Sequence, residues 1–348
     1  MNPTPFVSVI IPCYQEKRFI AECLDSLLEN DYPQEKMEIL VLDGGSTDGT
    51  GDILGQYSSR HPFIKVLENR EKFQAFAMNK GIKESRGEII IRCDAHSSYS
   101  RNYISRSVSR LSEDASVGNV GGIWVNSPSG KTRVSLAIAH SLECPLCVGP
   151  NSYRTGARKA CFVNTVPFGA WRREVFEEVG FFDENLRIAE DFEFNLRLIK
   201  SGRKILLDPE IQSRYHPRES FGELFKMMFR YGYWKNFVNR KHRTVSSFRQ
   251  ILPPLFVLYL FALVPLLFAS PLFALPLALY FALVVIYGFR IGAGKKSLNL
   301  VPFCALTFLL SHTGYGAGFL KGFWDVFIRR KRLAPGAEGA AGTGGGDA

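Results

Sequence analysis

The sequence lacks two glycine-rich motifs that hold nucleotides in many α/β proteins. The turn after the first expected strand reads Pro12-Cys13-Tyr14-Gln15-Glu16 and contains no glycine. The backbone there cannot approach a pyrophosphate as it does in dinucleotide-binding folds. No GxxxxGK[ST] pattern is present either. A dehydrogenase and a P-loop NTPase are therefore both excluded.

The chain also lacks a disulfide pattern, a signal-peptide pattern and a nucleic-acid-binding motif. Its 7 cysteines are scattered, and this arrangement is typical of a reducing, cytosolic environment. Cys144-Pro145-Leu146-Cys147 has no second pair or histidine at zinc spacing, so we interpret it as incidental. The net charge of +10 indicates an anionic partner, either membrane lipid or a phosphorylated substrate, rather than nucleic acid.

Charge is absent from Ile251 to Phe289, about 39 residues. That length predicts two membrane spans, about 251–269 and 271–289, joined near Ser270-Pro271. A third apolar segment, 298–320, contains His312 and three glycines. If it spans, the basic residues 329–332 lie outside, against the positive-inside rule. The alternative is a re-entrant or interfacial segment.

Up to about residue 100, short apolar runs alternate with segments of helical spacing. This alternation predicts a parallel sheet with right-handed crossovers. The expected elements are strands over 6–11, 38–42 and 64–67, helices over 16–29 and 74–84, and a fourth strand within Gly87–Ser98.

The fourth strand ends on Asp94-Ala95-His96. Ligands gather beyond the carboxyl ends of parallel strands, so Asp94 and His96 are placed to hold a metal-bound or phosphorylated ligand. On this stretch alone, an alternative is that Asp94 caps the turn and His96 is a surface histidine.

Five segments form one pattern in order and spacing: Val7–Glu16, Leu42–Thr50, Asn79–Gly81, Gly87–His96 and Ala189–Arg197. Together they resemble the family 2 glycosyltransferases. The resemblance covers roughly residues 5–240 and is to inverting enzymes, including membrane-attached ones that build bacterial exopolysaccharides. It implies an α/β domain of GT-A fold, with a Rossmann-like, mostly parallel sheet, followed here by a C-terminal transmembrane helical region.

Position by position, the resemblance implies a site for a nucleotide-sugar, which we expect to be UDP-linked. Pro12, Tyr14 and Glu16 would border the uracil and ribose. Asp43 would accept a hydrogen bond from the uracil ring, and Asp94 would lie by the ribose and a metal ion.

His96 stands where the family usually has the second Asp of a DxD motif. Imidazole suits Mn²⁺ better than Mg²⁺, which prefers oxygen ligands. The expected cofactor is therefore a divalent metal, Mn²⁺ or Mg²⁺, bound by Asp94 and His96. In many relatives a histidine closes over the diphosphate, which makes His216 a candidate third ligand.

The helix expected to open at Glu190 has three acids in its first four residues, Glu190, Asp191 and Glu193. Capping alone could favour acids there, but three exceed what capping needs. An inverting transferase requires a carboxylate that takes the proton from the acceptor hydroxyl. By motif position, the resemblance implies that Asp191 is this base and Glu190 its neighbour.

The loop before a helix at Arg173–Val179 lies on the acceptor side in relatives. The resemblance implies that Gly169 and Trp171 contact the acceptor, the alternative being that Trp171 is a core aromatic. Arg214 or Arg218 could offset charge on the leaving UDP. Processive synthases carry QxxRW hereabouts, whereas this chain has Gln212-Ser213-Arg214-Tyr215, so single-sugar addition is favoured.

Phe221–Phe237 has apolar residues at helical spacing with lysines and an arginine around them. This pattern predicts a basic amphipathic helix at the membrane surface, or else a helix packed on the catalytic domain. The basic cluster 240–243 predicts that this side is cytoplasmic. The expected domains are a catalytic domain 1–219, an interfacial helix and linker 220–250, a transmembrane region 251–328 and a disordered tail 329–348.

The sequence as a whole predicts a membrane-anchored enzyme that moves one hexose from a UDP-sugar to a lipid-linked (polyprenyl diphosphate) saccharide. It would act in the synthesis of exopolysaccharide or another cell-surface glycan, at the inner membrane. One alternative is a polyprenyl-phosphate glycosyltransferase that makes a lipid-linked monosaccharide. The other is a non-catalytic membrane scaffold in an assembly complex.

Overall fold

The computed structural model describes residues 4–331 and 333, except residues 129, 151 and 246–247. The predicted tail therefore lies almost wholly outside the described residues. The chain packs as two compact units. Met1–Val125 and Gly156–Tyr215 form the first, and Asn126–Thr155 and His216–Arg332 form the second. The bounds of the four predicted domains stay predictions.

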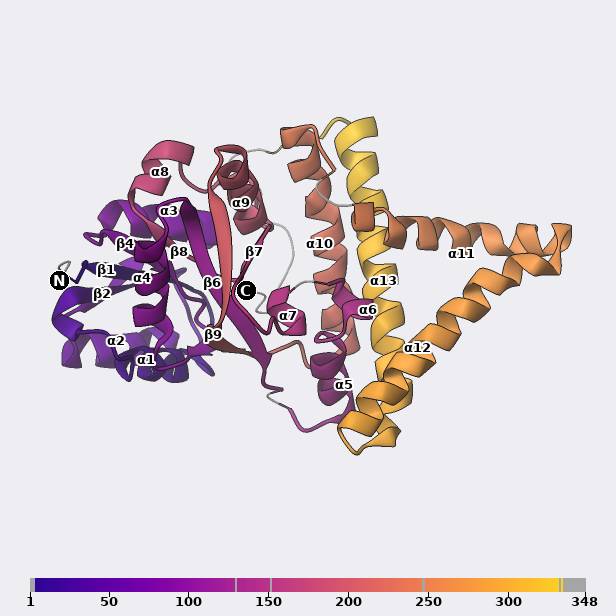
Figure 1. Ribbon diagram of the computed structural model, residues 1–348, viewed down its shortest axis with the longest axis horizontal. Helices are drawn as coiled ribbons and strands as arrows, with labels where there is room; N and C mark the ends of the chain where they lie inside the picture. Colours follow the sequence, from indigo (N-terminus) through magenta and orange to yellow (C-terminus); the bar gives the residue numbers. More distant parts are fainter. Residues whose placement is uncertain (1–3, 129, 151, 246–247, 332, 334–348) are drawn as a thin grey trace. The chain divides into compact units, whose positions relative to one another are not determined.

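A mixed sheet organises the first unit, in the strand order β3-β2-β1-β4-β8-β6-β9-β5, with β7 paired to β9 (Figure 1). The first four strands are parallel and are β1 (Val7–Cys13), β2 (Met37–Asp43), β3 (Ile64–Glu68) and β4 (Ile89–Arg92). In register, Cys13 lies opposite Asp43, which lies opposite Glu68. The carboxyl ends of these strands therefore share one edge, which confirms the predicted parallel sheet.

Strand β1 and most of β2 and β4 are buried on both faces, because helices cover a parallel sheet on each side. The near-continuous apolar runs in these strands, such as Ile89–Ile91, form the centre of the core. The helices of this unit are α1 (Ile20–Leu28), α2 (Thr50–Arg60), α3 (Gln74–Glu84), α4 (Tyr103–Glu113), α8 (Glu174–Val179), α9 (Glu190–Lys200) and the short η1 (Gln34–Lys36).

The rest of the sheet is antiparallel. Strand β8 (Ala170–Arg172) pairs with β4 and with β6 (Val117–Asn126), while β9 (Lys204–Tyr215) pairs with β5 (Ser97–Tyr99) and β7 (Cys161–Val163). Strand β9 runs unbroken through Asp208-Pro209. Arg106 and Arg110 on α4 hold the buried Asp208 carboxylate there at 2.9 and 2.6 Å.

The second unit is helical. Its elements are α5 (Arg133–Ser141), α6 (Pro145–Val148), α7 (Ser152–Thr155), α10 (Phe221–His242), η2 (Phe248–Gln250), α11 (Leu252–Ala269), η3 (Pro271–Ala274), α12 (Leu275–Gly294), η4 (Leu298–Leu300), α13 (Val301–Phe323) and the π-helical η5 (Trp324–Ile328).

Helices α10 and α13 lie side by side along most of their length (Figure 1). Three α13 glycines, Gly314, Gly318 and Gly322, face backbone carbonyls of α10, and a Cβ on Gly322 would lie only 2.5 Å from the Tyr233 oxygen. Asn236 on α10 also donates to the Phe319 carbonyl oxygen at 3.0 Å. Close backbone approach thus joins the two helices.

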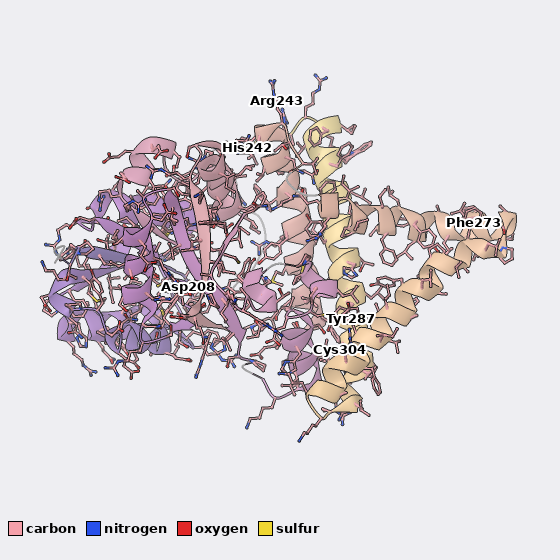
Figure 2. All side chains as sticks on the ribbon, viewed as in Figure 1. Asp208, His242, Arg243, Phe273, Tyr287 and Cys304 are labelled. Atoms are coloured by element: carbon pink, nitrogen blue, oxygen red, sulfur yellow. The ribbon has the colours of Figure 1, made fainter. Side chains whose placement is uncertain are left out.

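Three segments are long and apolar enough to cross a membrane: Leu252–Ala269, Pro271–Gly294 and Leu298–Ile328. The first two form a hairpin whose turn carries Phe273 (Figure 2). Only 11% of the most apolar window of each is buried, against 39% for the third. The hairpin therefore presents an apolar surface to its surroundings, whereas more of the third segment is covered by its neighbours.

Candidate active site

Two loops at the carboxyl edge of the sheet are joined by hydrogen bonds. The loop after β1 meets the loop after β2 where the Gln15 amide donates to Ser46 Oγ at 2.8 Å and the Glu16 amide to Thr50 Oγ1 at 2.9 Å. The Lys17 amide donates to Asp48 Oδ2 at 3.0 Å. Gln15 has a left-handed backbone, φ 58°. The two loops thus form one rim.

Asp43 closes the turn at the end of β2. Its Oδ2 accepts from the amides of Gly45 and Ser46 at 3.2 and 3.1 Å, and its Oδ1 accepts from Ser46 Oγ at 2.6 Å. Tyr14 packs against Gly44, where a Cβ would come within 2.9 Å of the ring. The predicted nucleotide-side residues Pro12, Tyr14, Glu16 and Asp43 therefore gather at this rim.

Asp94, directly after β4, lies at the centre of a polar cluster. Its Oδ1 accepts from Gln74 Nε2 at 3.1 Å and from Arg92 Nε at 3.0 Å. The Asp94 amide and the Tyr99 hydroxyl are 2.6 Å apart. These contacts hold the carboxylate in one orientation. If Asp94 only capped the turn, its side-chain hydrogen bonds to Gln74 and Arg92 would have no explanation.

Arg92 connects Asp94 to the acidic helix terminus. Its Nη1 donates to Glu190 Oε1 at 3.2 Å, and the side chains of Arg92 and Glu190 are 6% and 4% exposed. Burial lowers the pKa of the guanidinium, but Asp94 and Glu190 outweigh burial and raise it above its ordinary value. The guanidinium therefore stays charged between two carboxylates from distant parts of the chain.

The two adjacent acids of α9 differ in their surroundings. Burial, and then the neighbouring charge of Asp191, raise the pKa of Glu190 to about 7, against the opposing effect of Arg92. Asp191 is less buried, and its Oδ1 accepts from the Phe192 amide at 2.6 Å. Ala189 before them is left-handed, φ 67°, and this sharp entry starts the helix at the site.

His96 contacts the rim through Glu16. Its Nδ1 lies 3.0 Å from Glu16 Oε1, and Tyr215 meets the imidazole edge-on at 6.1 Å between ring centroids. Tyr215 in turn stacks on Trp124 at 4.1 Å. A carboxylate on one imidazole nitrogen is the usual arrangement for a histidine that binds metal through the other.

The predicted metal ligands are not all in one unit. His216 belongs to the second unit, where its Nδ1 lies 2.9 Å from the Ser127 carbonyl oxygen. Within the described part of the chain, no group of three His, Cys, Asp or Glu side chains could hold a metal ion. Asp94 and His96 remain as two candidate ligands. Two protein ligands suffice where substrate phosphates supply the others.

The two predicted acceptor contacts are buried. Trp171 is 2% exposed and packs edge-on against Phe176, Phe182 and Phe194 at 5.8 to 5.9 Å. A Cβ on Gly169, φ 120°, would lie 2.7 Å from Asn119. A buried ring offers no surface to an acceptor, so this packing favours the alternative of a core aromatic.

Arg92 was not predicted from the sequence to be a site residue. The available signal was a lone basic residue at the end of the strand Ile89-Ile90-Ile91-Arg92. A charge inside a buried strand needs a buried partner. The partners, Asp94 and Glu190, are 2 and 98 positions away, and only the fold brings Glu190 near.

Comparison with known proteins agrees with this geometry. The family described as "Glycosyl transferase family 2" matches residues 8–180, and "Glycosyl transferase family group 2" matches residues 160–292. A dolichyl N-acetyl-alpha-D-glucosaminyl phosphate 3-beta-D-2,3-diacetamido-2,3-dideoxy-beta-D-glucuronosyltransferase of Methanococcus voltae is 34% identical over 243 residues, or 68% of this chain and 74% of its own.

The succinoglycan biosynthesis protein ExoA of Rhizobium meliloti (strain 1021) is 29% identical over 337 residues, covering 94% of this chain and 96% of its own. A solved mannosyltransferase, PcManGT from Pyrobaculum calidifontis in complex with GDP-Man and Mn²⁺, shares the fold with a TM-score of 0.60 and 24% identity. The match covers 93% of this chain and 88% of that one. The chain belongs to glycosyl transferase family 2, with a GT-A catalytic fold and three apolar helices that could span a membrane.

Proposed function

We propose that this glycosyltransferase moves a single hexose from a UDP-sugar to a lipid-linked saccharide, polyprenyl diphosphate-linked, in the synthesis of a cell-surface glycan. The observation that carries the proposal is the chain of contacts Asp94–Arg92–Glu190. It joins a carboxylate at the nucleotide edge of the sheet to the acid pair of α9. A transferase needs these two groups on either side of the anomeric carbon.

On the donor side, the rim supplies the groups for the nucleotide. Pro12, Tyr14 and Glu16 border the base and ribose, and Asp43 accepts from the uracil. Its three existing contacts leave a carboxylate room for a further hydrogen bond. Asp94 lies by the ribose and the metal.

On the acceptor side, Asp191 takes the proton from the attacking hydroxyl. The C–O bond to the acceptor forms at the anomeric carbon as the bond to the UDP oxygen breaks, which inverts the configuration. Glu190 next to Asp191 adds negative charge when ionised and so raises the affinity of Asp191 for the proton. Arg92 fixes the position of Glu190 from inside the sheet.

A divalent metal fits this site. Asp94 and His96 would hold it, with Glu16 orienting the imidazole, and a bound metal would offset charge on the departing diphosphate. The Mn²⁺ in the Pyrobaculum enzyme complex supports metal dependence, and imidazole favours Mn²⁺ over Mg²⁺. Arg92 and Gln74 occupy Asp94 only in part, since a carboxylate has about four acceptor positions.

At the membrane, we propose that the α11–α12 hairpin is inserted and that α13 lies at the surface beside α10. Lys226 and Arg230 are exposed on α10, and exposed charges are costly in hydrocarbon. Because α13 packs along α10, α13 remains at the same depth. This arrangement keeps the basic residues 329–332 on the cytoplasmic side with the catalytic unit, as the positive-inside rule requires.

The relatives support a saccharide already attached to lipid as the acceptor. The Methanococcus enzyme is named for a dolichyl N-acetylglucosaminyl phosphate acceptor. The test is an assay of membrane fractions with UDP-glucose, UDP-galactose and UDP-GlcNAc and with polyprenyl-diphosphate saccharides. Transfer of one sugar is expected, and EDTA should abolish it, with recovery on adding Mn²⁺.

Other outcomes would redirect the proposal. Transfer to polyprenyl phosphate alone would indicate synthesis of a lipid-linked monosaccharide. UDP binding without turnover across the donor panel would indicate a scaffold. For topology, a reporter fused after residue 331 should read as cytoplasmic, and an extracytoplasmic signal would mean that α13 spans.

A further inference from the structure

Four apolar side chains remain exposed where α13 ends and η5 begins. They are Phe323, Trp324, Phe327 and Ile328, each between 42% and 53% exposed. Their spacing places them on one side of the helix, and we call them the terminal stripe. On the opposite side, a Cβ on Gly322 would lie 2.5 Å from the Tyr233 oxygen, and Asp325 accepts from the Tyr233 hydroxyl at 3.1 Å. The terminal stripe therefore faces away from α10.

The turn that carries the terminal stripe is fixed by hydrogen bonds. Lys321 donates to the two carboxylate oxygens of Asp325 at 2.6 and 2.7 Å. From α10, Arg240 Nη1 donates to the carbonyl oxygens of Val326 and Lys331 at 3.1 and 3.2 Å. Such bonds satisfy carbonyl groups that lack a partner at the end of a helix. The exposed side chains therefore belong to a well-defined helix end that is held beside the end of α10.

The terminal stripe continues the face of α13 to which the α11–α12 hairpin is attached. Gly316 of α13 closely approaches the Pro253 carbonyl at the start of α11. Phe323 and Phe327 follow Gly316 by 7 and 11 positions, which are about two and three helical turns. The two phenylalanines thus lie on the same side of α13 as the hairpin, which we propose to be inserted in the membrane.

Basic side chains follow the terminal stripe directly. Arg329 is 67% exposed, and Arg330 and Lys331 are exposed as well. The neighbouring acid, Asp325, is already paired within its own helix at 2.6 Å. Arg243 lies at the adjoining end of α10 (Figure 2). This end of the second unit therefore has an excess of positive charge next to an apolar surface.

An apolar stripe followed by cations suits the surface of an anionic membrane. Tryptophan is enriched where hydrocarbon meets water, because one end of its ring is apolar and the other can donate a hydrogen bond. Basic residues near a membrane surface are attracted to anionic headgroups. Exposed charges are costly in hydrocarbon, so the cations also limit how deeply this end can enter.

We propose that the terminal stripe, with Arg329, Arg330 and Lys331, binds anionic phospholipids at the membrane interface. The stripe enters the acyl chains near the headgroups, and the cations contact the phosphates of several lipids. Because a bilayer presents many phosphates, the cations need not converge on one of them. The inference rests on the proposed membrane arrangement of the second unit, but lipid contact can be measured without donor or acceptor.

The test places the full chain in lipid nanodiscs that contain phosphatidylglycerol and phosphatidylcholine in equal amounts. Bromine, which quenches tryptophan fluorescence at short range, is attached to the acyl chains of one lipid or of the other. The Trp324 signal is the emission that Trp324→Phe removes. Brominated phosphatidylglycerol should quench this signal about twofold more than brominated phosphatidylcholine, because the cations attract the anionic lipid.

Two variants separate the contributions of charge and of apolar surface. In Arg329→Gln/Arg330→Gln/Lys331→Gln, the ratio of the two quenching efficiencies should fall to about one. High salt should lower the ratio of the wild type in the same direction, since salt screens exposed charges. Phe327→Ser/Ile328→Ser should instead reduce quenching by both lipids to a similar extent, because the helix end is less deeply inserted.

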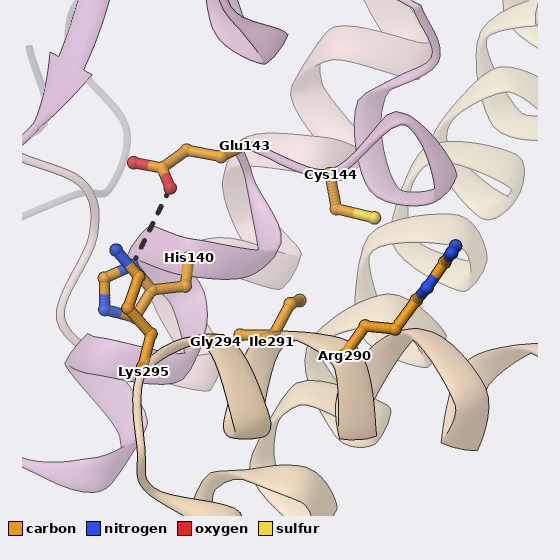
Figure 3. Close-up of a pocket in the computed structure, with 7 residues that line it drawn as sticks. All are labelled: His140, Glu143, Cys144, Arg290, Ile291, Gly294 and Lys295. Atoms are coloured by element: carbon orange, nitrogen blue, oxygen red, sulfur yellow. Dashed lines mark ion pairs between the residues drawn. The ribbon is translucent and has the colours of Figure 1, made fainter.

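The matched control removes three charges from the opposite end of α13. Arg290, Lys295 and Lys296 are exposed cations at the end of α12, and Figure 3 shows Arg290 and Lys295 at opposite sides of the pocket that α12 lines there. The end of α12 packs against Val301, about 34 Å along α13 from Trp324. Arg290→Gln/Lys295→Gln/Lys296→Gln should therefore leave the quenching ratio at Trp324 close to that of the wild type.

The outcomes that would overturn the inference are distinct. An unchanged ratio in the Arg329/Arg330/Lys331 variant would do so, and so would an equal decrease in the control, which would indicate a general effect of net charge. Absence of quenching by both lipids, together with a dimeric chain, would mean that a second copy covers the terminal stripe.

Transfer assays separate this inference from the proposed function. If the wild type prefers phosphatidylglycerol at Trp324 but transfers no sugar, the proposed function fails and the lipid-binding surface stands. If transfer proceeds and the quenching ratio does not depend on the three cations, the inference fails and the function stands.

Discussion

The two units position their key groups by opposite means. In the first, charged and polar side chains from distant segments meet in a buried network, with Arg92 between Asp94 and Glu190. In the second, α10 and α13 meet through glycines that bring backbone against backbone. The Arg92 network should be destabilised by the loss of a charge more than by a small change of side-chain volume. The contact between α10 and α13 should be destabilised by added volume more than by a change of charge.

The comparison is sharpest for substitutions that change one property alone. Replacing a carboxylate by its amide, or Arg by Gln, removes charge while keeping much of the shape. Replacing Gly by Ala adds one methyl group and no charge. Each unit should therefore respond strongly to one kind of change and weakly to the other.

The largest effect is expected for Asp191→Asn. This isosteric change removes the proposed base and should lower kcat by about 10²- to 10⁴-fold, with the thermal unfolding temperature nearly unchanged. Steady-state transfer assays measure it. Asp52→Asn, an exposed acid in the first turn of α2, serves as the control. Unimpaired transfer by Asp191→Asn would rule out the proposed mechanism.

The next effect is on stability. Arg92→Gln leaves the buried Glu190 and the partly buried Asp94 without their cation and should lower the free energy of unfolding by about 3–5 kcal/mol. Arg70→Gln removes an arginine whose side chain is 80% exposed and whose partner Glu68 is 60% exposed, so about 1 kcal/mol or less is expected. Denaturant unfolding of both variants checks the comparison. Equal decreases in the free energy of unfolding would mean that the buried Arg92 network stabilises the fold no more than an exposed ion pair does.

For the second unit, Gly318→Ala is the corresponding change. Its Cβ would overlap the Phe229 backbone, so α10 and α13 must move apart at a cost of about 1–3 kcal/mol. Gly222→Ala, where no atom lies within 4 Å, should instead gain about 0.5–1 kcal/mol from helix propensity. The unfolding temperatures of both variants are measured in detergent. An equal shift for the two variants would contradict the role of Gly318 in helix packing.

The smallest effect is a pH dependence. Because the pKa of Glu190 is raised to about 7, Glu190 is mostly protonated at pH 6 and mostly ionised at pH 8. kcat/KM should therefore rise modestly as pH passes through about 7, with an apparent pKa that belongs to the pair of acids. Glu190→Gln should flatten the profile between pH 6 and pH 8, while a surviving inflection would assign it to another group.

The same shift affects stability with the opposite sign. Between the ordinary carboxyl pKa of 4.5 and about 7, the folded protein binds more protons than the unfolded one. The contribution of Glu190 to stability therefore falls as pH rises through this window.

The parallel half of the sheet could be predicted because its strands are uninterrupted apolar runs. The expected helix at 74–84 matches α3. Helices α2 and α4 were missed for different reasons. Thr50–Arg60 buries only Thr50 and Leu54, so α2 depends on tertiary packing that a local pattern does not show. Tyr103–Glu113 places Ile104, Val108 and Leu111 on one buried face, so the helical spacing of α4 was an available signal.

The candidate site divides in the same way. Asp43, Asp94 and Glu190-Asp191 stand at recognisable ends of strands or helices, so their positions followed from the sequence. Arg92 gains its meaning from a partner 98 residues away. Trp171 lies in a three-residue strand whose inward face sequence alone does not reveal.

The rim formed by the two loops has a consequence for how the donor would be captured. Gln15, Glu16 and Lys17 are tied to Ser46, Thr50 and Asp48 by the protein's own hydrogen bonds. An incoming nucleotide thus meets a surface whose conformational entropy was lost during folding. Preorganisation of this kind should make binding of the nucleoside part fast and nearly rigid, leaving any slow rearrangement to the elements around the acceptor.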